Sequence, residues 1–90
     1  MPYRVIVPPD IEKRIAEFHP LLKSKIRAGL DDLSRDPYQG KALRQELKGF
    51  YSFQVSRYRI VYGIHHLVRE VNVLAIGPRH NVYRSLSEVR

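Results

Sequence analysis

From Phe50 onward the sequence changes from a helical to an alternating pattern, and this change constrains the fold more than any other feature. In "FYSFQV" (50–55) every second residue is apolar and faces one side, whereas Ser52 and Gln54 face the other. Two more strand-like segments follow, each after a short turn: 58–64 and 67–77. Consecutive strands joined by short turns pair antiparallel, so this half of the chain predicts an antiparallel sheet.

The N-terminal half predicts a short strand followed by two amphipathic helices. The β-branched run at 3–7 favours a strand, and it ends at Pro8-Pro9 because proline cannot donate to a ladder. Helices are predicted over 10–18 and 20–34, separated at His19-Pro20, since the residue before a proline disfavours the helical region. Their apolar stripes are Ile11, Ile15, Phe18, Leu22, Ile26, Leu30 and Leu33.

The order of these segments predicts a two-layer α+β fold. An N-terminal αα-hairpin packs on one face of an antiparallel β-sheet, in the order β-α-α-β-β-β. Residues 35–41 predict a loop, whereas 42–49 fits either a helical turn or the approach to a turn. A short helix or tail is expected after residue 77. Ninety residues suffice for one core, so 1–90 is predicted to form a single domain, with the uncovered sheet face as the natural place for a site.

Several classes of site are excluded by what the sequence lacks. The chain has no cysteine, which excludes disulfides and thiolate chemistry. Neither G-x-S-x-G nor a glycine-rich phosphate loop occurs, and the adjacent His65 and His66 point apart, so no metal or cofactor is expected. The sequence shows no signal-like N-terminus and no apolar run of membrane-spanning length. We therefore expect a cytoplasmic protein without a membrane partner.

The positive charge of the chain is unevenly distributed. Formal net charge is +7. Residues 1–36 hold seven Lys and Arg against six Asp and Glu, whereas 37–90 hold nine against three. A basic half of this kind favours a polyanion-facing surface, for RNA, DNA or an acidic protein segment. The alternative is that the chain is basic only for solubility.

A group of cationic and phenolic side chains falls on or near the predicted strand ends: Arg57, Arg59, Arg79, His80 and Tyr83. An arginine fork matches two phosphate oxygens and stays charged at any working pH. Tyrosine can stack on a base or assist proton transfer, and histidine titrates near neutrality. The alternative is that these residues are solvated charges that protect open strand edges. Composition and spacing do not decide between the two.

Four short motifs follow one another in the C-terminal half: Leu47-Lys48-Gly49 before the aromatic-led strand at Tyr51, Tyr58-Arg59-Ile60-Val61-Tyr62, Gly77-x-Arg79, and Val82-Tyr83. This ordered set resembles the RelE/ParE toxin superfamily of bacterial and archaeal toxin–antitoxin systems. The N-terminal strand and helix pair also match the order in that family. The resemblance therefore covers nearly the whole chain.

The resemblance implies a small antiparallel sheet with two helices against it and the first strand beside the last. RelE-type members are ribosome-dependent endoribonucleases that cut mRNA in the ribosomal A site, where a 2′-hydroxyl attacks the neighbouring phosphate. A cognate antitoxin with an acidic or amphipathic C-terminal segment wraps the toxin and blocks it. ParE-type members share the fold, inhibit DNA gyrase and lack the nuclease residues.

Carried over by position, the resemblance assigns catalytic roles to Arg59, Arg79 and Tyr83. Where the best-studied RelE type has lysines on the outward face of a strand, this chain has Ser52 and Gln54, which are neither acids nor bases. His80 is therefore predicted as the substitute proton-transfer group. The predicted RNA-binding residues are Lys41, Arg44, Lys48, Gln54 and Arg57.

Three functions remain open on the sequence. The first is a ribosome-dependent mRNA interferase, in which the cationic residues hold and cleave mRNA. The second is a ParE-like, non-nuclease inhibitor of DNA gyrase, which the neutral Ser52 and Gln54 favour. The third is a catalytically impaired toxin whose main partner is its antitoxin.

Overall fold

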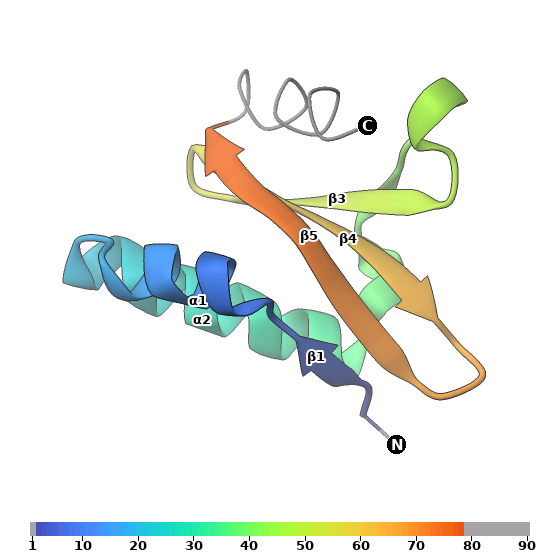
Figure 1. The fold of residues 1–90 in the computed structure, drawn as a ribbon, viewed down its shortest axis with the longest axis horizontal. Helices are drawn as coiled ribbons and strands as arrows, with labels where there is room; N and C mark the ends of the chain where they lie inside the picture. Colours follow the sequence, from blue (N-terminus) through green and yellow to red (C-terminus); the bar gives the residue numbers. More distant parts are fainter. Residues whose placement is uncertain (1, 79–90) are drawn as a thin grey trace.

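A computed structural model of the chain describes residues 2–78 and shows two helices on one side of a five-stranded sheet (Figure 1). The elements in chain order are β1 (Arg4–Ile6), α1 (Pro9–Ala16), α2 (Pro20–Arg35), the 3-10 turn η1 (Pro37–Gln39), β2 (Lys41–Ala42), the 3-10 turn η2 (Gln45–Leu47), β3 (Phe50–Val55), β4 (Tyr58–His65) and β5 (Glu70–Pro78). This confirms the α+β class. The short helix or tail predicted after residue 77 falls largely outside the described residues. In the described part, no helix combines the length and apolarity needed to cross a membrane.

The sheet is mixed rather than purely antiparallel. Its strand order is β1-β5-β4-β3-β2, with β1 parallel to β5 and all other neighbours antiparallel. The prediction of an antiparallel sheet was therefore wrong for one edge, whereas the place of the first strand beside the last is confirmed. In the sequence, both helices follow β1 and precede the other strands. A connection of this length lets the chain return so that β5 runs parallel to β1.

Two segment predictions need correction. The ambiguous stretch 42–49 adds an edge strand, β2, and one 3-10 turn rather than a helix. The last strand begins at Glu70 instead of 67, because residues 66–69 form the turn after β4 and Arg69 adopts a positive φ of 54°. Leu67 at this turn is 80% exposed, which is consistent with its lying outside the sheet.

The core lies between the helices and the near face of the sheet. The buried helical residues are Ile11, Ile15, Ile26, Leu30 and Leu33, as the apolar stripes predict; Phe18 and Leu22 pack at the margin. The sheet contributes Val55, Ile60, Tyr62, Val71, Val73 and Ile76. These side chains fix which face of each strand points away from the helices.

A β-bulge interrupts the pairing of β4 with β5. Val61 lies opposite Ala75 and Tyr62 lies opposite Val73, which leaves Leu74 as an additional residue on β5. Leu74 is 41% exposed. The bulge shifts the alternation of β5 by one residue, so odd-numbered positions face the core before it and Ile76 does so after it.

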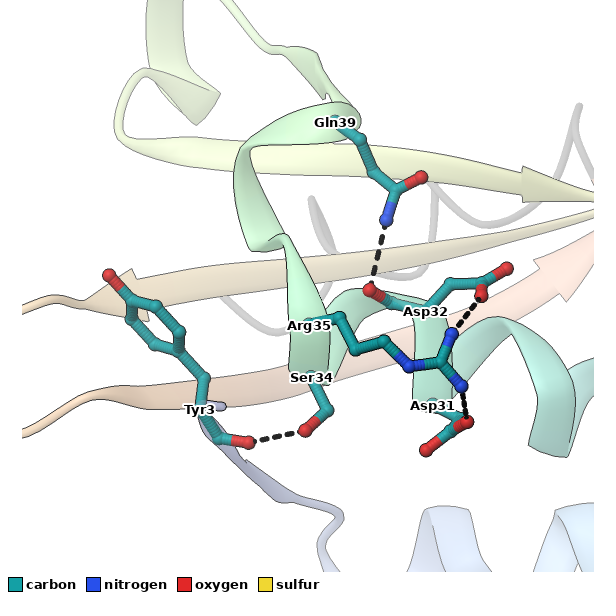
Figure 2. Close-up of polar contacts among 6 residues, drawn as sticks. All are labelled: Tyr3, Asp31, Asp32, Ser34, Arg35 and Gln39. Atoms are coloured by element: carbon teal, nitrogen blue, oxygen red, sulfur yellow. Dashed lines mark hydrogen bonds and ion pairs between the residues drawn. The ribbon is translucent and has the colours of Figure 1, made fainter. Parts of the chain in front are cut away.

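The start of β1 is tied to the end of α2 (Figure 2). The amide of Tyr3 donates to the carbonyl of Ser34 at 2.7 Å, and Ser34 Oγ donates to the carbonyl of Tyr3 at 2.7 Å. Beside this contact, Arg35 forms ion pairs with Asp31 and Asp32 on the surface of α2. The edge strand is thereby attached to the helical layer.

Tyr62 attaches the loop after α2 to the centre of the sheet. Its buried hydroxyl donates to the carbonyl of Pro37 at 2.7 Å and accepts from the amide of Gly40. Burial raises the pKa of Tyr62 to about 12. A Cβ at Gly40 would lie 2.2 Å from this hydroxyl, so the loop approaches the ring at a distance that only glycine permits.

Candidate functional site

The far face of the sheet, directed away from α1 and α2, carries Ser52, Gln54, Arg59 and Val61. Their neighbours along β3 and β4 pack into the core, and strand alternation therefore turns these four side chains to the opposite side. Gln54 pairs with Arg59 and Ser52 pairs with Val61, so residues from adjacent strands stand side by side. The prediction that Ser52 and Gln54 share one face of the strand, opposite to Tyr51, Phe53 and Val55, is confirmed.

Arg59 is held by two neutral oxygens of β3. Its Nη1 donates to Ser52 Oγ at 3.2 Å, and its Nη2 donates to Gln54 Oε1 at 3.3 Å. Ser52 is only 2% exposed, whereas Arg59 is half-buried. No carboxylate within residues 2–78 pairs with Arg59. The positive charge of Arg59 is therefore not compensated by an ion pair in that part of the chain.

The amide of Gln54 is itself held at both ends. Its Oε1 accepts from Arg59, and its Nε2 donates to the carbonyl of Ser56 at 3.1 Å. Ser56 begins the two-residue turn that joins β3 to β4 and has a positive φ of 57°. The turn, the glutamine and the arginine thus form one hydrogen-bonded series.

A small apolar cluster lies beside these polar groups on the far face. Val61 and Ala75 are buried, and the half-buried Leu43 and Phe50 pack against them. The sequence reasoning did not identify this cluster, because Leu43 falls in the ambiguous segment. Within this cluster only Leu43 and Phe50 keep partly exposed side chains, so an apolar contact beside Arg59 would come from these two residues.

The predicted RNA-binding residues are all exposed but do not form one compact group. Lys41 lies opposite Ser52 in the β2–β3 pairing and so shares the far face with it. Arg57 lies in the β3–β4 turn, whereas Arg44 and Lys48 flank η2 before the other end of β3. Because the six residues of β3 span about 20 Å, Arg57 at one end of the strand is separated from Arg44 and Lys48 at the other end by about that length.

Three of the four predicted catalytic residues, Arg79, His80 and Tyr83, lie outside the described residues. Of that set the structure places only Arg59. Arg59 pairs with Gly77 on β5, which has no side chain to occupy the space on that side.

The contacts of Ser52 and Gln54 with Arg59 are the part of the site that the sequence did not predict. The sequence marks both as positions without an acid or base, and Gln54 also as an RNA-binding residue, whereas the structure makes both of them hydrogen-bond acceptors for Arg59. A signal was available for Gln54: a two-residue turn places Val55 opposite Tyr58, and hence Gln54 opposite Arg59. No comparable signal exists for Ser52, whose contact is diagonal across the strands.

Comparison with known proteins identifies the family. The sequence model described as ParE toxin of type II toxin-antitoxin system, parDE, matches residues 10–83. Toxin RelG of Mycobacterium tuberculosis is 33% identical over 86 residues, which cover 93% of this chain and 99% of that protein.

Solved structures show the same architecture. The toxin–antitoxin complex RelBE2 from Mycobacterium tuberculosis contains a chain that matches with a TM-score of 0.78 and 30% identity, over 88% of this chain and 100% of the other. A substituted variant of E. coli toxin RelE in the free state matches with a TM-score of 0.77 at 16% identity, over 99% and 98%, which shows the fold alone. From the family model and the relative that is one-third identical, the chain belongs to the RelE/ParE family of toxins of type II toxin–antitoxin systems.

Proposed function

We propose that this toxin is a ribosome-dependent mRNA endoribonuclease that inhibits translation. The observation that supports it best is Arg59, a half-buried arginine on the far face that no carboxylate of the described residues neutralises. A guanidinium in this setting suits a phosphodiester, because its planar fork matches two phosphate oxygens. The half-buried Leu43 and Phe50 of the apolar cluster would supply the contact for a base or ribose.

In the proposed reaction the 2′-oxygen of one ribose attacks the adjacent phosphorus, and the bond from phosphorus to the 5′-oxygen of the next nucleotide breaks. Arg59 and Arg79 stabilise the negative charge that develops on the phosphate oxygens. His80 and Tyr83 are proposed to move the protons, one from the attacking hydroxyl and one to the leaving oxygen. Arg79 follows Pro78 directly in the chain, and β5 pairs with Arg59 at Gly77, next to that end of the strand.

Binding of mRNA in the ribosomal A site is proposed to use the cations at both ends of β3 together with Gln54. The cations are Lys41, Arg44, Lys48 and Arg57. Each phosphate contact of this kind adds affinity that falls with salt and carries little sequence information. Substituting any one cation is therefore expected to weaken mRNA binding without changing the cleavage position.

The proposal is tested by primer extension on mRNA after the toxin is induced in cells. New ends at codon-phased positions inside the coding region are expected. In a purified system the same ends should appear only when ribosomes are present. Arg79→Ala should lose both cleavage and growth arrest, whereas Ser24→Ala on the exposed side of α2 should retain both. If Arg79→Ala cleaves as the parent does, the assignment of Arg79 is wrong.

A ParE-like inhibitor of DNA gyrase is the second candidate, favoured by the ParE family model and by the neutral Ser52 and Gln54. Plasmid supercoiling and cleavage-complex assays separate the two functions, because an mRNA interferase leaves gyrase unaffected. Inhibited supercoiling without new mRNA ends would establish this alternative. A toxin that neither arrests growth, nor produces new mRNA ends, nor inhibits supercoiling would instead indicate a catalytically impaired toxin that mainly binds its antitoxin.

We also propose that a cognate antitoxin covers the basic surface with an acidic segment. The matching Mycobacterium tuberculosis chain comes from a toxin–antitoxin complex. The cations of this chain are concentrated in residues 37–90, so an acidic partner would be steered toward that part. Stopped-flow association at increasing ionic strength tests the idea. The association rate is expected to fall steeply with salt, and a rate that is insensitive to salt would contradict it.

A further inference from the structure

The two terminal nitrogens of Arg59 are held by two different side chains of the same strand. Nη1 donates to Ser52 Oγ and Nη2 to Gln54 Oε1. A single contact leaves a guanidinium able to rotate about its long stem, whereas two contacts at separate nitrogens define its plane. The relevant pairing is local, because Gln54 lies directly opposite Arg59 and Ser52 lies two residues before Gln54. The orientation of the fork is therefore set by β3.

Neutral acceptors orient an arginine without neutralising it. The arginines that bind carboxylates in the described part, Arg4, Arg27 and Arg35, have part of their charge compensated by an adjacent anion. Arg59 has instead a hydroxyl and an amide oxygen, which accept hydrogen bonds but carry no net charge. Such a pair fixes geometry and leaves the attraction for an external anion in place.

The contacts to β3 also leave donors available on the guanidinium. An arginine offers five N–H groups, and the two hydrogen bonds to β3 use one on each terminal nitrogen. Toward residues 2–78, three further N–H groups of the same planar guanidinium make no hydrogen bond, and this number is enough for a bidentate contact with two oxygens of a phosphodiester. Gly77, opposite Arg59 on β5, adds no side chain that would compete for this space.

We infer that Ser52 and Gln54 are positioning residues that orient Arg59 for a phosphodiester of RNA. The inference takes its substrate from the proposed function, whereas the geometry of the arginine is independent of it. Gln54 extends the arrangement to the β3–β4 turn, since its Nε2 donates to the carbonyl of Ser56. The neutral residues that separate this chain from lysine-bearing relatives thus acquire a specific role: they align a cation rather than transfer a proton.

Two substitutions separate orientation from charge. Ser52→Ala removes one acceptor and leaves the charge of Arg59 unchanged. Gln54→Glu keeps an acceptor for Nη2 and places an anion against the guanidinium. In full-length toxin with ribosomes, Ser52→Ala is expected to lower kcat about ten-fold to a hundred-fold with little change in KM, because one charge-assisted hydrogen bond is lost. Gln54→Glu is expected to raise KM, because the charge that attracts mRNA is compensated.

A spectroscopic measurement tests the orientation without reference to cleavage. In NMR spectra of 15N-labelled toxin, the signals of Arg59 are assigned as those missing from an Arg59→Lys variant. In the parent protein, Nη1 and Nη2 of Arg59 should give separate signals. Ser52→Ala should merge them through faster rotation, whereas Gln54→Glu should keep them apart. Titration with dimethyl phosphate should shift the Arg59 signals in the parent protein and leave them nearly unchanged in Gln54→Glu.

Controls for fold and net charge lie on the exposed side of α2. Ser24→Ala matches the loss of a hydroxyl, and Ala28→Glu matches the added negative charge. Both should behave as the parent does in every assay. The inference is overturned if Ser52→Ala keeps separate Nη signals, or if Gln54→Glu binds dimethyl phosphate as the parent does. A parent toxin that orients Arg59 but cuts no mRNA would refute the proposed function and leave the positioning role standing.

Discussion

The arginines that pair with carboxylates and the arginine of the far face are held in different ways. Arg4 pairs with Glu70 between β1 and β5, and Arg27 pairs with Glu12 between the two helices. On α2, Arg35 pairs with Asp31 and Asp32 (Figure 2). On the far face, Arg59 contacts only the neutral oxygens of Ser52 and Gln54 among the described residues. Within the described residues, Arg59 is therefore a cation without a compensating carboxylate, whereas Arg4, Arg27 and Arg35 each pair with at least one.

The difference matters because the two arrangements have different energetic consequences. The paired arginines are solvent-exposed, and exposed ion pairs contribute little to stability. Arg59 is half-buried, and no carboxylate of residues 2–78 pairs with it, so its burial costs some hydration that no ion pair within that range offsets. An arrangement with that cost is typical of a site that awaits an anionic ligand.

The largest expected effect comes from Arg59→Ala. If Arg59 stabilises charge on the phosphate, its loss should lower the rate of mRNA cleavage about 10²–10³-fold and relieve growth arrest. Arg59→Lys should recover little, because an ammonium lacks the planar fork that Ser52 and Gln54 orient. Single-turnover cleavage on programmed ribosomes measures both. An Arg59→Ala toxin that remains fully active would remove the functional contrast between Arg59 and the paired arginines.

The next effect concerns the loop that connects the two layers. Tyr62→Phe leaves the carbonyl of Pro37 and the amide of Gly40 without their buried partner, so the free energy of unfolding should fall by about 1–3 kcal/mol. The Tyr62 pKa of about 12 lies above the ordinary value of 10.0. The corresponding stability is therefore complete below pH 10 and is lost as pH rises through 12.

Urea unfolding between pH 8 and pH 12 measures this effect. The parent protein should lose stability more steeply than Tyr62→Phe over the alkaline part of the range. Equal slopes for the two proteins would show that the Tyr62 hydroxyl does not titrate differently in the folded state.

A smaller effect is expected from Arg27→Gln. The hydrogen bond from Arg27 lowers the pKa of Glu12 below its ordinary value of 4.5. Because the pKa of Glu12 is lower in the folded state than in the unfolded state, the ion pair stabilises the fold fully at pH values above the unfolded-state pKa. This contribution is lost as the pH falls through the folded-state pKa. Because both side chains are over two-fifths exposed, the substitution should cost only about 0.2–0.5 kcal/mol at neutral pH. Denaturant unfolding should show that this difference shrinks as the pH falls below 4.5.

The smallest effect is expected from Arg35→Ala. Its side chain is 66% exposed and pairs with two aspartates on its own helix. Stability should change by no more than about 0.5 kcal/mol, and mRNA cleavage should not change at all. Thermal unfolding and the cleavage assay together test the contrast with Arg59. A loss of cleavage in Arg35→Ala would mean that the helical side also takes part in function.

The sequence predicted those parts of the fold that local patterns determine. The apolar stripes from Ile11 to Leu33 predicted the buried faces of the helices, and alternation along β3 placed Ser52 on the face directed away from the helices. The relative direction and the register of strands that are distant in the sequence do not follow from local sequence patterns. The parallel pairing of β1 depends on where the chain returns after two helices, and the bulge at Leu74 depends on packing against β4.

The candidate site shows the same division. The position of Arg59 followed from the motif in its strand, whereas its acceptors required the pairing of β3 with β4 and the rotamers of two side chains. Ser52 in particular carries no pattern that distinguishes a buried acceptor from an exposed polar residue. Chemistry held by diagonal contacts becomes visible only in three dimensions.

Gly40 offers a lesson for reading sequence alignments of this family. It lies in a loop after η1 and performs no chemistry, yet a Cβ there would meet the hydroxyl of Tyr62 at 2.2 Å. Selection against a larger residue at this position would therefore act through packing around a buried phenol. An invariant glycine at the corresponding place in other toxins would mark the tyrosine that it accommodates, and the two positions should change together during evolution.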